Sequence, residues 1–201
     1  DVCSSDLIDR VTTPDGFAAR FIIPSLGEFL NAFPAIDLEL VETQPFARLV
    51  DEGLDLAIRI TSKPDENLIV RKIGFSRTVM VAAPSYLAGN PAPKSPAEIQ
   101  MHQCVGFSPL TWRDAWPIGG ETIAVKPRLL TNSTDSLRSA ALAGLGLVVL
   151  PEWFVADALA SGTLNRVLPG YDLPASAIYA AYPSNRLIPP KVRVFVDYVA
   201  D

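Results

Sequence analysis

Residues 131–153, TNSTDSLRSAALAGLGLVVLPEW, decide the fold class of this chain. The polar residues at 132–134 are types that cap helix N-termini, and the apolar spacing after them predicts a helix that ends at the glycines of 144–146. Residues 147–150 (LVVL) are an uninterrupted apolar run, which is typical of a strand buried on both faces. Pro151 closes that strand and is well placed to open another helix. The unit is therefore cap, helix, buried strand, helix.

The cap at 132–135 has two interpretations. Hydroxyls and backbone N–H groups at a helix start can bind an anion such as a carboxylate. The same residue types also cap ordinary helices that bind nothing, and without further context this simpler interpretation is favoured.

The composition indicates one large or two small domains. Of the 201 residues, 49% are hydrophobic, which is enough for extensive cores. No segment approaches the roughly 18–20 apolar residues of a membrane span. The first residues show no secretory signal pattern, and Cys3 and Cys104 provide no disulfide framework. We therefore expect a reducing, cytoplasmic location without a membrane partner.

Several functional classes are disfavoured by the charge and by the residue types. The net charge is −5, whereas a domain that grips DNA alone should carry a basic patch. His102 is the only histidine, and no His/Cys cluster has metal-ligand spacing. The GLGL sequence at 144–147 lacks the spacing of a dinucleotide fingerprint. We expect no catalytic residues, no metal and no cofactor. For Cys104 a structural thiol is favoured over a redox switch, because no partner cysteine is evident.

The first sixty residues alternate strand and helix patterns. A strand at 10–13 ends at a Pro-Asp-Gly turn, and a helix follows up to Phe33, kinked or restarted by Pro24. Strand patterns at 36–41 and 54–60 flank a short helix that includes Phe46, Leu49 and Val50. This β-α-β-α-β order predicts a parallel sheet with covering helices.

The second part of the chain has a similar organisation. A proline-rich connection separates a strand at 78–83 from a helix that opens at Ser95. Further strands are predicted at 104–107, 147–150, 164–168 and 177–182, with a small hairpin over 122–125 and 128–130 and a final helix after 189–190.

Two βαβ units joined by two crossing strands imply two lobes with a cleft. Open parallel sheets bind ligands beyond the carboxyl ends of their strands. Three turns fall at such ends, at 13–16, 43–46 and 132–135, and each combines a hydroxyl or an acid with a helix start.

Four motifs in order resemble the effector-binding domain of LysR-type transcriptional regulators. They are RVTTPDGFAARFIIPSLGEFLNAFPAIDLEL, EGLDLAIRI, DSLRSAALAGLGLVVLPEWFVADALASGTLNRVLP and YPSNRLIPPKVRVFVDYV, and together they cover nearly all of residues 10–200. The resemblance implies an α/β, two-lobed, periplasmic-binding-protein-like (type 2) fold, with two mainly parallel sheets joined by two crossover strands. Lobe I would be 8–81 plus 182–201, lobe II would be 82–181, and residues 1–7 would be a tail.

The resemblance also implies a function and a set of ligand contacts. The chain would sense a small-molecule effector, with carboxylates among the candidates, and would reach DNA only through an N-terminal winged helix-turn-helix that is absent here. Asp15 departs from the family pattern, in which a small or hydroxyl residue is common, and an acid there disfavours an anion beside it. Carried onto matching positions, the contacts are Pro14, Asp15, Thr43, Arg59, Thr61, Phe107, Asn132, Thr134 and Pro151.

Self-association and a rival function complete the expectations. The resemblance implies a homodimer, and a tetramer in the full-length form. Apolar residues on the helix at 24–33, the strand at 36–41 and the helix at 153–159 exceed what one sheet face needs, so they are either partner surface or core. The rival function is a transport-type solute-binding protein of the same fold class, which would need a secretory signal.

Overall fold

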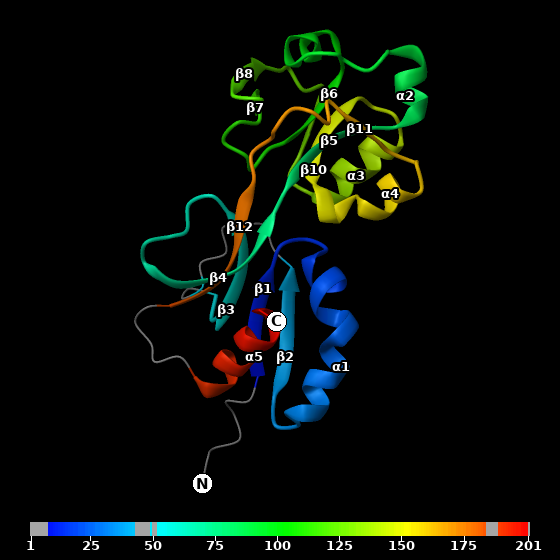
Figure 1. Cartoon of the computed structure of the whole chain (residues 1–201). Helices are drawn as coiled ribbons and strands as arrows, with labels where there is room; N and C mark the ends of the chain where they lie inside the picture. Colours follow the sequence, from blue (N-terminus) through cyan, green and yellow to red (C-terminus); the bar gives the residue numbers. More distant parts are fainter. Residues whose placement is uncertain (1–7, 43–48, 50–51, 184–188, 201) are drawn as a thin grey trace. The chain divides into compact units, whose positions relative to one another are not determined.

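The computed structural model describes residues 8–42, 49, 52–183 and 189–200 (Figure 1). The chain divides into unit 1, residues 1–75 with 176–201, and unit 2, residues 76–175. Both boundaries lie six residues before those expected for the lobes. The reason is strand pairing: β5 (Thr78–Ala82) joins the sheet of unit 2, and β12 (Ser176–Pro183) joins the sheet of unit 1.

Unit 1 contains a five-stranded mixed sheet. Strand β1 pairs in parallel with both β2 and β3, whereas β12 runs antiparallel to β3. The parallel pairs confirm the predicted parallel arrangement of the first three strands, and the antiparallel strand is one that connects the two units. In spatial order the strands are β2 (Asp37–Glu42), β1 (Ile8–Thr13), β3 (Leu56–Thr61), β12 and β4 (Leu68–Ser76).

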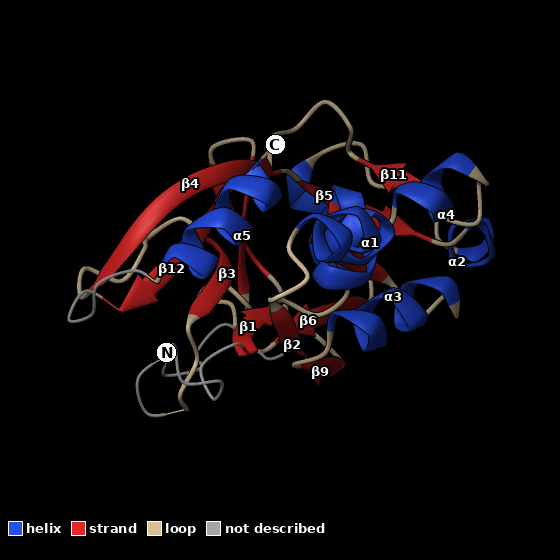
Figure 2. Ribbon diagram, turned by 90° about the horizontal axis from the view of Figure 1, so that it is seen from below, coloured by secondary structure: helices blue, strands red, loops and turns tan. Residues whose placement is uncertain are grey.

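The helices of unit 1 pack together on its sheet. A π-helical turn, η1 (Ala18–Ile22), leads into α1 (Ile23–Ala32), and Pro24 lies in the first turn of α1, so it restarts the helix as predicted. Figure 2 shows α5 (Pro190–Ala200) lying along the same sheet. The ring of Phe29 in α1 lies 5.3 Å from that of Phe195 and 4.7 Å from that of Tyr198, both in α5.

Unit 2 is built around a second mixed sheet. Strand β10 pairs in parallel with β6, and β6 pairs in parallel with β9. Strand β5 runs antiparallel to both β10 and β11. The spatial order is β11 (Asn165–Val167), β5, β10 (Leu147–Pro151), β6 (Cys104–Phe107) and β9 (Leu129–Thr131).

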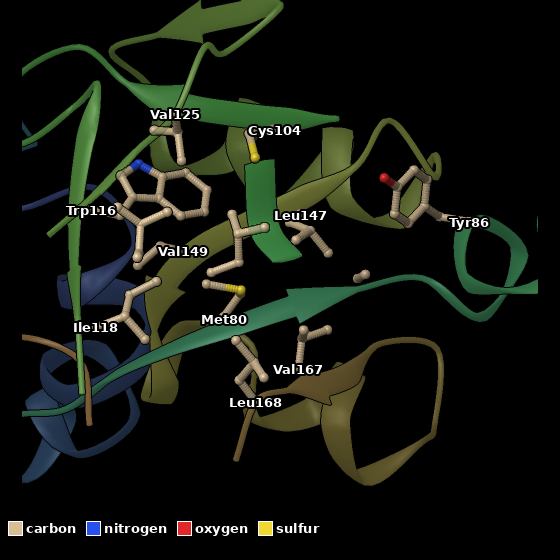
Figure 3. Close-up of a cluster of buried hydrophobic side chains, with 13 residues drawn as sticks. Met80, Tyr86, Cys104, Trp116, Ile118, Val125, Leu147, Val149, Val167 and Leu168 are labelled. Carbon is tan, nitrogen blue, oxygen red and sulfur yellow. The ribbon is translucent and has the colours of Figure 1, made fainter. Parts of the chain in front are cut away.

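Strand β10 is the centre of unit 2, and its side chains are buried on both faces of the sheet as predicted. Leu147 and Val149 belong to a cluster with Met80 and Trp116, which Figure 3 shows. Val148 and Leu150 belong to a second cluster on the α3 (Thr134–Leu142) side. Alternate residues of a strand point to opposite faces, so one apolar run serves two cores.

The remaining elements of unit 2 depart from the sequence prediction in detail. Ser95 precedes a 3-10 helix, η2, and the expected helix over 152–160 is split into η3 and α4. The hairpin is formed by β7 and β8, which turn at Gly119–Gly120, while residues 129–131 pair with β6 instead. These elements are α2 (Pro84–Gly89), η2 (Pro96–Met101), β7 (Ala115–Ile118), β8 (Glu121–Ala124), η3 (Glu152–Phe154) and α4 (Ala156–Ala160).

Two elements of unit 1 were not matched by the sequence prediction or cannot be compared with it. Strand β4 was not predicted, because the Arg71–Lys72 pair interrupts its alternation of apolar and polar residues. The short helix expected around Phe46 and Val50 lies outside the described residues.

Candidate functional site

The start of α3 is a side-chain cap centred on Ser133. The Ser136 backbone N–H donates to Ser133 Oγ at 3.3 Å, and the Ser133 N–H donates to Thr131 Oγ1 at 3.1 Å. Ser133 is therefore the N-cap, and Thr134 is the first residue of the helix. These two hydrogen bonds define the cap, and the helix dipole gives this end a partial positive charge.

Four of the predicted ligand contacts lie at one edge of the unit 2 sheet. Phe107 ends β6, and its register partner Thr131 ends β9 directly before Asn132 and the cap. The Ser108 N–H donates to the Thr131 carbonyl at 2.9 Å, which fixes the turn after β6 beside the cap. Pro151 ends β10, which is parallel to β6. The structure thus brings Phe107, Asn132, Thr134 and Pro151 to the carboxyl ends of three neighbouring strands.

Four predicted contacts likewise meet at one edge of the unit 1 sheet, and Thr43 lies outside the described residues. Pro14 and Asp15 follow β1, and both are half-buried. Arg59 and Thr61 are among the last three residues of β3, which is parallel to β1. Thr61 Oγ1 is engaged locally, because it donates to the Lys63 carbonyl at 3.0 Å and accepts from the Lys63 N–H at 3.1 Å.

The unit 1 edge also contains two residues that sequence reasoning did not select. Glu42 ends β2, and its Oε1 accepts a hydrogen bond of 3.2 Å from the Gly16 N–H, in the turn just before η1. Thr13 ends β1 and is 1% exposed, and within the described residues its Oγ1 has no hydrogen-bond partner. The turn at 13–16 was predicted as a ligand position, but Thr13 was not chosen among the individual contacts. Its burial depends on packing and has no sequence signal.

The charges of the two edges differ. In unit 2 the positive end of α3 faces the carboxyl ends of the strands. In unit 1 the Gly16 backbone N–H, in the turn before η1, donates to the Glu42 carboxylate, and Asp15 adds a second acid nearby. Arg59 supplies a positive charge, and it helps to lower the pKa of Asp65, after the larger effect of the Asn67 backbone N–H. An anion is therefore better accommodated by the unit 2 edge than beside Asp15.

The reactive residue types of unit 2 lie at the opposite ends of its strands. Gln103 N–H donates to Tyr86 Oη at 2.9 Å, and Tyr86 Oη lies 3.1 Å from His102 Nδ1. Because the Tyr86 oxygen accepts from Gln103, its hydroxyl proton is available to donate to the His102 nitrogen. Burial raises the pKa of the Cys104 thiol to about 12, which is typical of a structural thiol. No group of three metal-ligating side chains occurs among the described residues.

Exposed apolar side chains lie on the first helical segment of unit 1. Phe21 is 46% exposed and Ile23 is 51% exposed, while Ile22 and Phe29 are buried. In unit 2, Trp153 and Phe154 are half-buried and Val155 is buried. The apolar excess noted in the sequence is thus partly core and partly surface. No described helix is long and apolar enough to cross a membrane.

Comparison with known proteins identifies the family. Residues 10–201 match the model of the LysR substrate binding domain. The chain belongs to the LysR substrate binding domain family. It is 35% identical over 192 residues to the HTH-type transcriptional regulator PtxR of Pseudomonas aeruginosa, covering 94% of this chain and 62% of PtxR. The CrgA regulatory domain of Neisseria meningitidis, a LysR-type transcriptional regulator, superposes with a TM-score of 0.85 at 27% identity, covering 96% of this chain and 97% of that one.

These relatives decide between the two functions left open by the sequence. The AphB regulatory domain of Vibrio vulnificus superposes with a TM-score of 0.74 at 30% identity, covering 96% of each chain. The relatives are transcriptional regulators and not transport binding proteins, so this LysR-type chain is an effector-binding regulatory domain with the periplasmic-binding-protein-like fold. It spans less than two thirds of the length of PtxR.

Proposed function

We propose that this chain senses a small-molecule effector with the two strand edges described above. The observation that carries the proposal is the coincidence, in each unit, of parallel-strand carboxyl ends with a helix start. Such edges are the general ligand positions of open α/β sheets. The contacts are Pro14, Asp15, Thr43, Arg59, Thr61, Phe107, Asn132, Thr134 and Pro151.

The charge distribution supports an effector with one acidic group. A carboxylate is stabilised by the N-terminal end of α3, where the dipole is positive and the hydroxyls of Thr134 and Ser133 are close. The remainder of the effector then meets Asp15 and Glu42, which accept hydrogen bonds from hydroxyl or amino groups. A compound with a carboxylate at both ends binds less well, because its second charge is repelled by those acids.

The proposal includes self-association and DNA binding by the full-length protein. LysR regulators form oligomers, and the exposed Phe21 and Ile23 provide an apolar surface for a second copy of this chain. The chain is a homodimer, and the full-length protein is a tetramer that reaches DNA through an N-terminal winged helix-turn-helix. Regulation of transcription places the protein in the cytoplasm. The regulatory roles of the relatives support a non-catalytic role.

A thermal-shift screen tests the effector proposal. Monocarboxylates, dicarboxylates, amino acids and aromatic acids are added to the purified chain, and a compound at 100 times its Kd should add about 2.7 kcal/mol to the free energy of unfolding. Thr134→Ala should then weaken binding of a hit by about 2- to 13-fold, which corresponds to one neutral hydrogen bond. Thr122→Ala is the matched control, because Thr122 is exposed on β8, outside both edges. Equal losses in the two variants would contradict the assignment.

Sedimentation at micromolar concentration tests the dimer. The chain should sediment as a dimer, and Ile23→Asp should convert it to a monomer, since a buried charge opposes an apolar interface. Met101→Asp, on another exposed apolar residue, should leave the dimer intact. A wild-type chain that is a monomer at this concentration would show that these residues do not form a partner surface by themselves.

A further inference from the structure

The connection from β4 to β5 is where the chain first passes from unit 1 to unit 2, between Phe75 and Ser76. Figure 1 shows β4 running into β5 through this short segment. Ser76 is a polar residue that is only 3% exposed, although it stands at a boundary between units. A buried hydroxyl needs a hydrogen-bond partner, so the surroundings of Ser76 reveal what holds the connection.

Two hydrogen bonds tie this segment to η3. The Trp153 indole N–H donates to Ser76 Oγ at 3.1 Å, and the Glu152 backbone N–H donates to the Arg77 carbonyl at 2.9 Å. The next residue along, Thr78, is the register partner of Pro151 in the β5–β10 pair. Residues 76–78 are therefore held by three consecutive residues, Pro151 at the end of β10 and Glu152 and Trp153 of η3.

The position of η3 is itself fixed by neighbouring elements. Glu152 forms an ion pair with Arg166 of β11, and the ring of Trp153 packs edge-on against Phe154 at 5.4 Å. Val155, which directly follows η3, is completely buried in the α3-side cluster. Because η3 is anchored in this way, a side chain that projects from it can act as a rigid clamp on the connection.

We propose that Trp153 and Ser76 form a clamp that holds residues 76–77 to unit 2, and so confines the hinge between the two units to the backbone just before Ser76. A hinge is a few residues that absorb a backbone change between two packed bodies. Because the clamp fixes Ser76 and Arg77, these two residues cannot absorb such a change, and only the backbone just before them is left to move. Pro151, a proposed effector contact, is two residues from Trp153, so the clamp also links the effector edge to the hinge. This last link rests on the proposed function, whereas the clamp itself does not.

Amide hydrogen exchange measures the clamp directly. Trp153→Phe keeps an aromatic ring but removes the indole N–H, and Ser76→Ala removes its acceptor. Each variant should accelerate exchange of the Glu152 amide, which bonds to Arg77, by about 2- to 13-fold, as expected for the loss of one neutral hydrogen bond. The double variant should add little to either single variant, because both remove the same bond. Trp112→Phe is the matched control, since Trp112 is half-buried in a separate cluster.

Spin-label distances measure the consequence for the two units. In a Cys3→Ser background, nitroxides at Glu28→Cys in α1 and Glu121→Cys in β8 report one distance distribution, and both positions are exposed. The distribution should broaden in Trp153→Phe and in Ser76→Ala and stay unchanged in Trp112→Phe. The proposal is overturned if the clamp variants exchange like the control. It is also overturned if exchange accelerates while the distance distribution keeps its width. Neither result bears on whether an effector binds, which the thermal-shift screen decides separately.

Discussion

The thiol of Cys104 should be almost unreactive in the folded chain. Cys104 begins β6, beside the central strand β10 of unit 2, is 2% exposed, and belongs to the cluster that contains Trp116 and Leu147 (Figure 3). Burial raises the pKa of its thiol from 9.0 to about 12. Since the thiolate is the reactive form, both the charge state and the access of the reagent oppose reaction.

The size of the effect follows from the pKa. At about pH 8, roughly 9% of a thiol with a pKa of 9.0 is ionised, against roughly 0.01% for a pKa of about 12, a ratio of roughly 900. A thiolate of higher pKa is intrinsically more nucleophilic, by roughly 20-fold over this interval. Ionisation alone therefore slows the reaction by roughly 40-fold, and exclusion of the reagent from the core slows it further.

The assay compares native and denatured protein. In the Cys3→Ser variant Cys104 is the remaining cysteine, and its reaction with Ellman's reagent is followed at about pH 8 with and without guanidinium chloride. The native rate should be lower by at least about 40-fold and should rise with denaturant, because reaction then requires opening of the fold. A native rate within about tenfold of the denatured rate would refute the assignment of Cys104 as a structural thiol and would reopen a redox role.

Three further predictions concern stability. Leu147→Ala should lower the free energy of unfolding by about 2–5 kcal/mol in chemical denaturation, because Leu147 is fully buried, while Leu145→Ala, at an exposed position, should change it by less than about 0.5 kcal/mol. Burial lowers the pKa of His102 below its usual 6.5, so as the pH falls the imidazole is protonated in the unfolded chain before it is protonated in the folded chain. The free energy of unfolding should therefore fall as the pH drops below about 7. In a series of melts at different pH, His102→Gln should reduce this dependence of stability on pH. Lys191→Met should destabilise the chain by about 1.5–3 kcal/mol, because it removes the cation that lies 3.0 Å from the buried Asp9 carboxylate; an unchanged midpoint would show that this ion pair is dispensable.

Local sequence patterns predicted the elements whose stability is local. The cap, helix and strand at 131–151 were correct because their signals, a hydroxyl cap and an uninterrupted apolar run, belong to neighbouring residues. The cap was placed at 132–134, and only the structure shows that Ser133 is the residue that accepts the hydrogen bond. A sequence containing several suitable side chains in a row cannot choose among them, because the choice depends on backbone angles.

Long-range pairing was the part that local patterns missed. Strand β4 lies next to β12 in the sheet, about a hundred residues away in sequence, and its own residues carry no clear alternation. Residues 128–130 were assigned to a hairpin, but β9 (Leu129–Thr131) pairs in parallel with β6, an arrangement that needs a long connection. Of the nine predicted contacts, eight lie at the described strand edges. Thr13 and Glu42 were not selected, because the features that distinguish them have no sequence pattern: Thr13 is buried, and Glu42 accepts a backbone hydrogen bond from Gly16.

The most direct test of the proposed function is an amide NMR titration of the chain with the strongest hit of the thermal-shift screen. The largest shift changes should occur at residues 13–16 and 59–61 in unit 1 and at 107–108, 131–135 and 151–153 in unit 2, where the parallel strands end beside helix starts. Saturable changes centred instead on His102, Gln103 and Tyr86, at the other ends of the unit 2 strands, would contradict the proposed function.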